Sequence, residues 1–377
     1  MDTRLFAQLP VSKIDQYQPV GGGDINEAYR LTDENGIRYF LLIQPNHTKE
    51  FFKHEVGGLK LLAQTVSTPE VLDWGGFGPD AYLLLSYINH QPAGDQYEMG
   101  KQLAQLHKRR SPNKQYGFDG GFTMGTYTAD NTWQPKWEKF FVNQRLESLK
   151  RLIQERGLWT AEMETAYAKS IKTFKRLMAA YHPLPSLLHG DLWSGNFMFD
   201  PDGQPVFIDP AVFYGDREFD LGITHVFGGF NADFYQGYQD TYPLEKGFEK
   251  RLPFYQLYYL MFHLSQFGAG SQGRVLQMLE LCANKYRRSQ AILVTGVFLR
   301  CHFYKEPGRK CDQAHFNLLI LAAEAFASLP MTGQKRYPQS GPPQIFLEGQ
   351  TIRPETPPTE RSLRAAQSIL KHWPWLR

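Results

Sequence analysis

Residues 1–90 consist mainly of short runs of apolar, β-branched and aromatic residues, separated by Gly, Asn and Asp. Such runs are typical of β-strands, and the residues between them are typical of turns. One stretch differs, because its apolar residues recur every three or four positions and so predict an amphipathic helix. The predicted strands are residues 18–31, 37–44 and 81–88, and the predicted helix is residues 49–64.

From residue 95 onward the apolar period becomes that of a helix, interrupted by three short strand-like runs. This change predicts an α+β chain with a small β-rich lobe over residues 1–90 and a larger, mainly helical lobe over residues 91–288. The junction at residues 86–92 is the expected hinge. The predicted helices are 98–109, 137–155, 161–181, 251–267 and 274–287, and the predicted short strands are 186–191, 196–200 and 205–209.

Residues 289–377 form a C-terminal extension of different character, to which the sequence assigns no role. Residues 291–306 predict a strand or a buried helix, and residues 315–329 predict a helix. Residues 331–360 are rich in Pro, Gly, Gln and Thr, which predicts irregular structure. Residues 361–377 predict a short basic amphipathic helix, which we interpret as a docking or surface helix rather than a membrane anchor because its apolar face is short.

The composition fits an ordinary globular protein, with 42% hydrophobic and 21% charged residues in 377. The net charge of +3 is small, and no Lys/Arg run interleaved with aromatics predicts a nucleic-acid partner. No apolar run reaches the roughly 18 residues of a membrane span, and the N-terminus lacks a signal-peptide core. Cys282, Cys301 and Cys311 lack metal-type spacing, so we expect a cytoplasmic protein without disulfides or zinc. The oligomeric state stays open.

The strongest chemical signal is LHGDLWSGN at residues 188–196, followed by FIDP. Asn196 follows Asp191 by five residues, and Asp209 follows Asn196 by thirteen. Phosphoryl transfer requires one carboxylate facing the acceptor hydroxyl and separate oxygen ligands for Mg²⁺. The His189–Asp191 pair followed by an Asn has the form of a kinase catalytic loop. We therefore predict that Asp191 is the catalytic group and that Asn196 and Asp209 hold the metal.

Three stretches, LLHGDLWSGN, FIDPAVFYGDREFDL and PFYQLYYL, closely resemble the fructosamine (ketosamine-3-) kinase family, part of the larger aminoglycoside-phosphotransferase and choline-kinase-like group. The resemblance continues through GGGDINEAYRL, HEVGGLKLL and NTWQPKWEKFFVNQRL and covers residues 5–288. It implies a two-lobed protein-kinase-like fold. It also implies that ATP and Mg²⁺ are used to phosphorylate a sugar hydroxyl of small-molecule or protein-linked ketosamines, such as ribulosamine or fructosamine Amadori adducts. The phosphorylated adduct then falls apart, so the implied role is deglycation.

The resemblance also implies roles for individual residues. Asp191 resembles the catalytic base, Asn196 and Asp209 resemble Mg²⁺ ligands, and His189 is expected to brace the loop through hydrogen bonds. Trp193 is expected beside the phosphoryl acceptor, where its indole could stack on a sugar or cap the pocket.

A second charged stretch follows the metal position. By resemblance, Asp216, Arg217 and Glu218 shape the substrate side, although a purely structural role fits these residues equally well. Asp220 begins a helix and is expected to accept backbone N–H bonds from the catalytic loop.

In the small lobe, the GGGDIN segment predicts a phosphate-binding turn, because glycines let backbone N–H groups approach phosphates closely. The candidates are Gly22, Gly23, Asp24 and Ile25. An ordinary turn is the alternative. The run 83–88 is the expected hinge strand beside adenine, and it contains Leu85 and Tyr87.

Kinases of this group carry a Lys on the strand after the glycine turn, paired with a helix carboxylate. Here Leu42 falls at the Lys position, whereas Glu55 retains the carboxylate. Leu can neither donate to phosphate nor neutralise Glu55. Another cation could take its place, with Lys49, Lys53 and Arg38 as candidates. Alternatively, catalysis proceeds with weaker nucleotide positioning, or the protein binds nucleotide without catalysis.

The leading hypothesis is an ATP-dependent ketosamine kinase, since Asp191, Asn196 and Asp209 are all present. Two alternatives remain: a kinase for another hydroxylated amine, such as an aminoglycoside or choline, and a non-catalytic nucleotide-binding pseudokinase.

Overall fold

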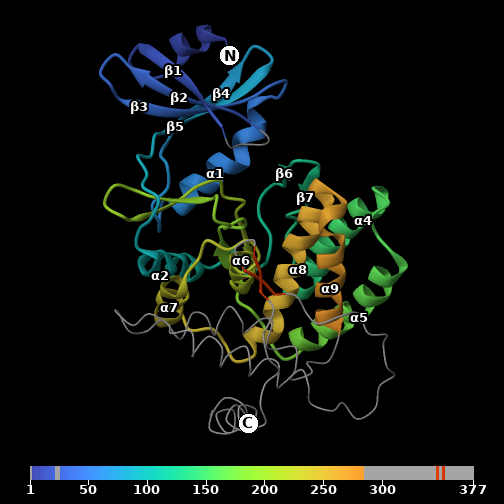
Figure 1. The fold of residues 1–377 in the computed structure, drawn as a ribbon. Helices are drawn as coiled ribbons and strands as arrows, with labels where there is room; N and C mark the ends of the chain where they lie inside the picture. The colour runs from blue at the N-terminus through green and yellow to red at the C-terminus, as the bar shows by residue number, and fades with distance from the viewer. Residues whose placement is uncertain (1, 22–25, 284–344, 348–349, 353–377) are drawn as a thin grey trace, which may run out of the picture. The chain divides into compact units, whose positions relative to one another are not determined.

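The computed structural model describes residues 2–21, 26–283, 345–347 and 350–352. The chain divides into two compact units, Met1–Val294 and Thr295–Arg377. The first unit contains all of the predicted site residues, and it consists of a β-sheet region followed by a mainly helical region (Figure 1).

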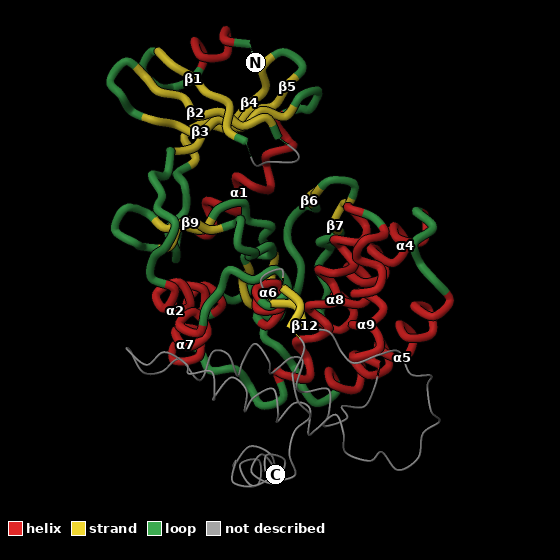
Figure 2. Tube along the Cα trace, viewed as in Figure 1, coloured by secondary structure: helices red, strands yellow, loops and turns green. Residues whose placement is uncertain are grey.

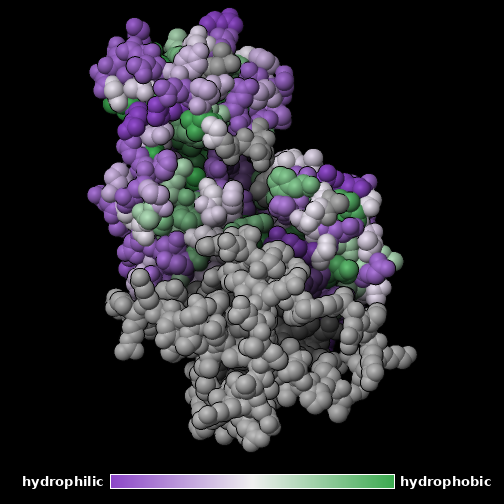
Figure 3. Space-filling view, viewed as in Figure 1, coloured by the Kyte–Doolittle hydropathy of each residue, from purple (hydrophilic) through white to green (hydrophobic). Residues whose placement is uncertain are grey.

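The sheet region is a five-stranded antiparallel sheet in the order β1-β2-β3-β5-β4. Its third strand, which lies at the centre, pairs Leu42 with Ala28 on one side and with Leu83 on the other. The strands are β1 (Ile14–Val20), β2 (Glu27–Asp33), β3 (Arg38–Gln44), β4 (Val71–Phe77) and β5 (Asp80–Ser86). On the face drawn in Figure 3, hydrophilic residues predominate over this region.

The alternation along β3 divides its apolar side chains between two small cores, because successive residues of a strand point to opposite faces. Leu41 and Ile43 pack on the face covered by the 3₁₀-helix η1 (Thr3–Gln8). Leu42 packs on the other face, against Phe52 and Val56. That face is covered by η2 (Lys49–Phe52) and α1 (Lys53–Leu62).

The helical region contains the largest core of the described residues, built around α8. Helices α2 and α7 pack together, as do α6 with α8 and α5 with α9 (Figure 2). The helices are α2 (Gln96–His107), α3 (Trp137–Lys139), the π-helix η3 (Phe140–Leu146), α4 (Glu147–Glu155), α5 (Ala161–Met178), α6 (Glu218–Thr224), α7 (Ala232–Thr241), α8 (Phe248–Phe267), the 3₁₀-helix η4 (Ala269–Ser271) and α9 (Gln272–Ala283). Short two-stranded sheets pair β6 (Phe122–Met124) with β7 (Tyr127–Ala129), β8 (Ser186–Leu188) with β11 (Phe213–Gly215), and β9 (Phe197–Phe199) with β10 (Pro205–Phe207).

Helix α1 packs directly against the helical region. Gly58 lies where an added Cβ would be 3.2 Å from both Pro210 and Val212, so a side chain there would have to displace them. The ring of His54 stacks on Phe122 with 4.8 Å between centroids. These contacts hold the helix that carries Glu55 against the segment that follows Asp209.

The predicted α+β architecture with a β-rich first region and a helical second region is confirmed. The structure adds elements that the sequence pattern did not predict, namely η1, β4, the β6–β7 hairpin, β11 and α7. The single strand predicted over 18–31 is wrong, because that range contains parts of two strands, β1 and β2. Residues 137–155 are helical as predicted, with a π-helical segment in their middle. None of the helices in the described part of the chain combines the length and apolar character needed to span a bilayer.

The predictions for residues 291–306, 315–329 and 361–377 lie outside the described residues. Residues 331–360 were expected to be irregular, but two short strands within them, β12 (Ile345–Leu347) and β13 (Gln350–Ile352), pair antiparallel.

Candidate active site

The predicted catalytic loop connects β8 to β9 and begins with a turn that requires glycine. Gly190 has φ +87°, a left-handed conformation that side-chain-bearing residues rarely adopt. A Cβ at this position would also overlap the carbonyl oxygen of Ala211. The backbone of the loop is therefore pressed against the segment that follows Asp209, and this close approach brings two distant parts of the motif together.

His189 and Asp220 brace this loop, as the sequence predicts. The carboxylate of Asp220 accepts the backbone N–H of His189 at 2.7 Å and that of Gly190 at 2.9 Å. Burial lowers the pKa of His189 to about 4, so its ring is neutral at pH 7. Nε2–H then donates to the carbonyl of Ile208 at 3.0 Å, and Nδ1 accepts the backbone N–H of Asp191 at 3.3 Å.

Two further residues that support the loop were not predicted from the sequence. His107 on α2 lies 3.0 Å from Asp220 through Nε2 and 2.8 Å from the hydroxyl of Tyr238 through Nδ1. Tyr259 on α8 donates its hydroxyl to the carbonyl of Gly190 at 3.1 Å. Both side chains are fully buried. The sequence offered no short-range signal, because each residue lies on a helix far from the motif along the chain.

Asp191 and Asn196 are joined directly. The side-chain amide of Asn196 donates to the backbone carbonyl of Asp191 at 2.8 Å and to its carboxylate at 3.0 Å. Both donor hydrogens are thus directed at Asp191, which leaves the amide oxygen of Asn196 for another partner. The backbone N–H of Ile208 donates to the backbone carbonyl of Asn196 at 3.1 Å. This bond holds the end of the strand that precedes Asp209 against the same loop.

Asp209 has φ +50°, an uncommon conformation for a residue with a side chain. Such strain persists only where the surroundings enforce it, and it often occurs at functional sites. Here the hydrogen bonds of Ile208 to Asn196 and of Ala211 to His189 fix the chain on both sides of Asp209.

The carboxylates of Asp191, Asp209 and Glu55 act on one another. Burial and then the charge of Asp209 raise the pKa of Asp191 to about 7, although the hydrogen bond from Asn196 opposes the shift. Burial and the charge of Asp209 raise the pKa of Glu55 to about 8. Desolvation by the surrounding protein also raises the pKa of Asp209, although this residue keeps exposed surface. The three acidic groups are therefore close enough to interact, and the charge of Asp209 acts on both Asp191 and Glu55.

This donor set suits a hard cation. A carboxylate of Asp209 and an amide oxygen of Asn196 are oxygen ligands of the kind that Mg²⁺ prefers, and Mg²⁺ commonly takes only one or two protein carboxylates with phosphates and water completing its shell. No group of three His, Cys, Asp or Glu side chains among the described residues is arranged to hold a metal ion.

On the nucleotide side, Leu42 points to the face of the sheet that carries α1 and is 6% exposed. None of the three candidate replacement cations pairs with Glu55. Lys53 lies 3.2 Å from Glu50, Lys49 lies over the ring of Trp74, and Arg38 lies over the ring of Tyr87. Among the described residues Glu55 forms no ion pair.

Of the other predicted nucleotide contacts, Leu85 is buried in the α1-facing core and Tyr87 follows β5. Gly22, Gly23, Asp24 and Ile25 lie outside the described residues.

Trp193 is 42% exposed beside the loop. Its indole ring lies across Gly195, where an added Cβ would overlap it.

Asp216, Arg217 and Glu218 are all buried inside the helical region. Asp216 accepts the hydroxyls of Tyr181 and Tyr255, and Glu218 accepts two N–H groups of Arg251 at 2.6 and 2.8 Å. Arg217 donates to the backbone carbonyls at positions 242 and 243. Their polar groups are occupied by these partners, which favours the structural alternative left open by the sequence.

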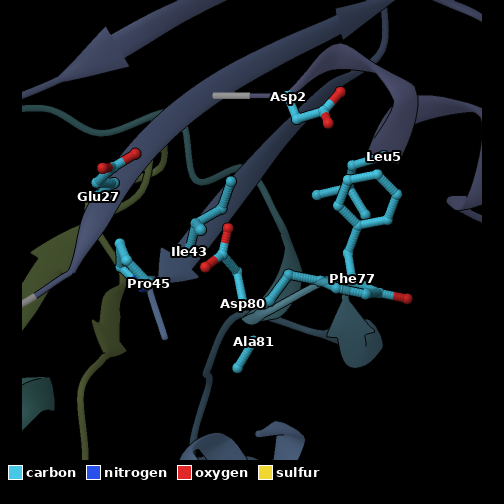
Figure 4. A pocket seen from close by; sticks show the side chains of 9 residues that line it. Asp2, Leu5, Glu27, Ile43, Pro45, Phe77, Asp80 and Ala81 are labelled. Carbon is cyan, nitrogen blue, oxygen red and sulfur yellow. The ribbon is translucent and has the colours of Figure 1, made fainter. Parts of the chain in front are cut away.

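A cavity of about 160 Å³ lies elsewhere, on the η1-facing side of the sheet region, and contains none of the motif residues (Figure 4). Its carboxylates already have partners: Asp2 accepts from Arg4, Glu27 from Tyr29, and Asp80 from the backbone of Asn46. This cavity is therefore not the candidate active site.

A β-sheet region packed through one helix on a helical region, with a braced His-Gly-Asp loop and a nearby Asn and Asp, defines a protein-kinase-like phosphotransferase. A solved structure shares this fold. An aminoglycoside phosphotransferase crystallised with AMP-PNP and hygromycin B shares the fold, with a TM-score of 0.54 at 15% identity, over 75% of this chain and 99% of that chain.

The chain belongs to the fructosamine kinase family, whose family model matches residues 3–285. It is 46% identical to a probable ketoamine kinase of Lactiplantibacillus plantarum over 70% of this chain and 92% of that protein. It is 41% identical to a probable ketoamine kinase of Staphylococcus aureus over 74% of this chain and 99% of that protein. A structure from Thermobifida fusca, provisionally described as a fructosamine-3-kinase, aligns with a TM-score of 0.67 at 25% identity, over 74% of this chain and 97% of that chain.

Proposed function

We propose that the protein transfers the γ-phosphoryl group of ATP to a sugar hydroxyl of a ketosamine. The main support for this proposal is that Asp191, Asn196 and Asp209 lie close together. Together they supply one base and two oxygen ligands for a metal ion, which phosphoryl transfer needs. The ketoamine kinase names of the relatives support the acceptor class.

Asp191 is the proposed base. Its carboxylate takes the proton of the acceptor hydroxyl as the hydroxyl oxygen bonds to the γ-phosphorus. The bond between that phosphorus and the β–γ bridging oxygen breaks, and ADP leaves with both electrons. Asn196 orients the base, because its amide group donates to the Asp191 carboxylate at 3.0 Å. When bound by Asn196 and Asp209, Mg²⁺ would neutralise phosphate charge.

We assign the remaining roles by region. Residues 1–90 would bind the nucleotide, with Gly22–Ile25 at the phosphates, Glu55 near them, and Leu85 and Tyr87 beside adenine. Residues 91–288 would carry the catalytic groups, with Trp193 at the acceptor. Asp216, Arg217 and Glu218 would act on the substrate side only indirectly, through the buried network that they form.

We propose deglycation in a reducing cytoplasm as the biological context. A phosphate ester next to the ketose carbonyl is a better leaving group than hydroxide. Once the carbonyl tautomerises to the enamine, inorganic phosphate would leave, and water would then hydrolyse the resulting C=N bond and release the amine. The absence of paired cysteines at disulfide or zinc spacing in the sequence supports a reducing compartment.

The test is a turnover assay with ATP, Mg²⁺ and either a ribulosamine or a fructosamine. We expect phosphorylation of at least one of them, and Asp191→Asn should reduce kcat by at least about 10²-fold, the lower end of general-base effects. Asp202→Asn, an exposed Asp on the turn between β9 and β10, is the matched control and should keep full activity. Equal rates for wild type and Asp191→Asn would refute the catalytic assignment.

One observation favours a second candidate, a nucleotide-binding pseudokinase: Leu42 leaves Glu55 without a cation among the described residues. A nucleotide-dependent rise in melting temperature without turnover of any ketosamine, aminoglycoside or choline would support it. Turnover of an aminoglycoside or choline alone would support the remaining alternative.

A further inference from the structure

Exposed aromatic side chains lie on the catalytic loop, on the segment that follows α6 and at the end of α8. Trp193, Phe227 and Phe267 are 42%, 39% and 63% exposed and are three of the eight large apolar side chains exposed among the described residues. Clustered exposed apolar groups usually mark a binding surface. Together with His263, they form what we call the aromatic rim.

Helix α8 connects the rim to the catalytic loop. Residues four apart lie on the same face of a helix, so Tyr259, His263 and Phe267 form one row. The inner end of this row contacts the loop, because Tyr259 donates to the carbonyl of Gly190 at 3.1 Å. Farther out, the rings of His263 and Phe267 lie 4.6 Å apart, and Phe227 lies 5.9 Å from His263. The rim therefore continues outward from the position of Asp191.

The segment that presents Phe227 is held in place. Gly228 and Gly229 both adopt left-handed φ, 76° and 91°, and Gly229 packs so closely on Ser194 that an added Cβ would overlap its side chain. Gln96 clamps the segment, donating to the carbonyl of Gly229 at 2.9 Å and accepting the N–H of Asn231 at 3.0 Å. Ser194 is the neighbour of Trp193 on the catalytic loop, so these contacts hold the segment that carries Phe227 against that loop.

Arg274 is exposed and follows by three residues Ser271, the residue that contacts His263. Burial and the charge of Arg274 lower the pKa of His263, whose Nδ1 is 2.7 Å from the hydroxyl of Ser271. Arg274 is thus a charged group close enough to His263 to act on it.

We propose that the aromatic rim binds the amine-derived part of the ketosamine and favours adducts of single amino acids with apolar side chains over adducts on lysine-rich peptides. This inference rests on the proposed function. With the sugar hydroxyl at Asp191, the amine substituent must extend from the loop, and the rim is the apolar surface that begins there. Its ring faces attract the basic nitrogen of the adduct and pack against an apolar side chain. Arg274 suits the carboxylate of a free amino acid and repels additional lysines.

The experiment compares kcat/KM for three adducts of the same sugar: those of phenylalanine, of glycine, and of a lysine-rich peptide. Wild type should prefer the phenylalanine adduct at least tenfold over the peptide adduct. In Phe227→Ala/Phe267→Ala, the phenylalanine-to-glycine ratio should fall at least tenfold. Arg274→Gln should lower the phenylalanine-to-peptide ratio. Tyr17→Ala, which removes an aromatic ring of 45% exposure from β1, should leave all ratios unchanged.

The outcomes separate the two proposals. If wild type turns over all three adducts with similar kcat/KM, or if the double variant lowers all of them equally, the rim does not select the amine and this inference is wrong while the proposed function stands. If wild type phosphorylates none of them with either sugar, the proposed function itself fails, and the inference fails with it.

Discussion

Replacing Leu42 by Lys tests whether position 42 faces the phosphates. Leu42 is 6% exposed, on the α1-facing side of β3 and on the same side as the helix that carries Glu55. A lysine there could keep its stem among Phe52 and Val56. Its ammonium group could then extend toward the carboxylates of Glu55, Asp191 and Asp209, which we call the acidic centre. We expect Leu42→Lys to increase turnover and to reduce stability.

The magnitude follows from two opposing terms. One preorganised electrostatic contact to a reacting phosphate contributes about 2.7–4 kcal/mol. To pair with the new lysine, Glu55 must ionise, and its pKa of about 8 makes this cost about 1.4 kcal/mol at pH 7. The difference, about 1.3–2.6 kcal/mol, corresponds to a roughly ten- to eighty-fold rise in kcat/KM for ATP. Loss of the buried leucine side chain costs about 1.5–3 kcal/mol of folding free energy, so the melting temperature should fall by several degrees.

The assay is steady-state turnover at saturating ketosamine and varied ATP, paired with thermal unfolding. Leu42→Met, which conserves volume without adding charge, should stay within about twofold of wild type. In Leu42→Lys/Glu55→Gln the gain should shrink, because the lysine loses its partner. If Leu42→Lys folds but turns over ATP no faster than Leu42→Met, position 42 does not face the phosphates and the reasoning fails.

Three further outcomes are expected. The pKa of Asp191 is about 7 instead of its ordinary 3.8, and the pKa of Glu55 is about 8 instead of 4.5. The two protonated carboxyls therefore contribute folding stability that is fully present below these ordinary pKa values. We expect this contribution to be lost as the pH rises through 7 and 8. Because Mg²⁺ favours the ionised forms, its thermal stabilisation in the presence of ADP should be larger at pH 8 than at pH 6, and Asp209→Asn should abolish this difference. Gly190→Ala should lower kcat at least tenfold and destabilise the fold by at least about 1–2 kcal/mol, the cost of left-handed backbone alone, measured by denaturant unfolding. His107→Leu removes a hydrogen bond to the buried carboxylate of Asp220 and should cost about 1.5–3 kcal/mol of stability; an unchanged unfolding midpoint would contradict this role.

The elements found from the sequence were those with a clear apolar period. Strand β3 was found because it is a short apolar run bounded by turn residues, and α8 because its apolar residues extend over a length too great for a strand. Strand β4 was missed because Asp73, Gly75 and Gly76 are poor strand formers, and only pairing with β5 makes this stretch extended.

The residues of the candidate site also fall into two groups, those that a local sequence pattern identifies and those that only tertiary packing brings to the site. The sequence predicted Asp191, Asn196 and Asp209 because all three lie close together along the chain, on one loop and at the ends of two short strands. His107 and Tyr259 were not predicted, because only the packing of α2 and α8 brings them to the loop. The burial of Asp216 and Glu218 also depends on tertiary packing, so their sequence motif could not distinguish a substrate contact from a buried network.

The acidic centre connects these observations. Carboxylates that raise one another's pKa are costly to bury in ionised form, and the lysine that the resemblance predicts on β3 would have reduced this cost. Here Leu42 instead adds apolar surface on the sheet face that carries α1, and among the described residues no cation forms an ion pair with Glu55. A bound cation must then supply the compensating charge, together with the donors that accompany the triphosphate. Turnover should therefore depend more steeply on Mg²⁺ concentration in wild type than in Leu42→Lys, whose added ammonium group provides part of the same neutralisation.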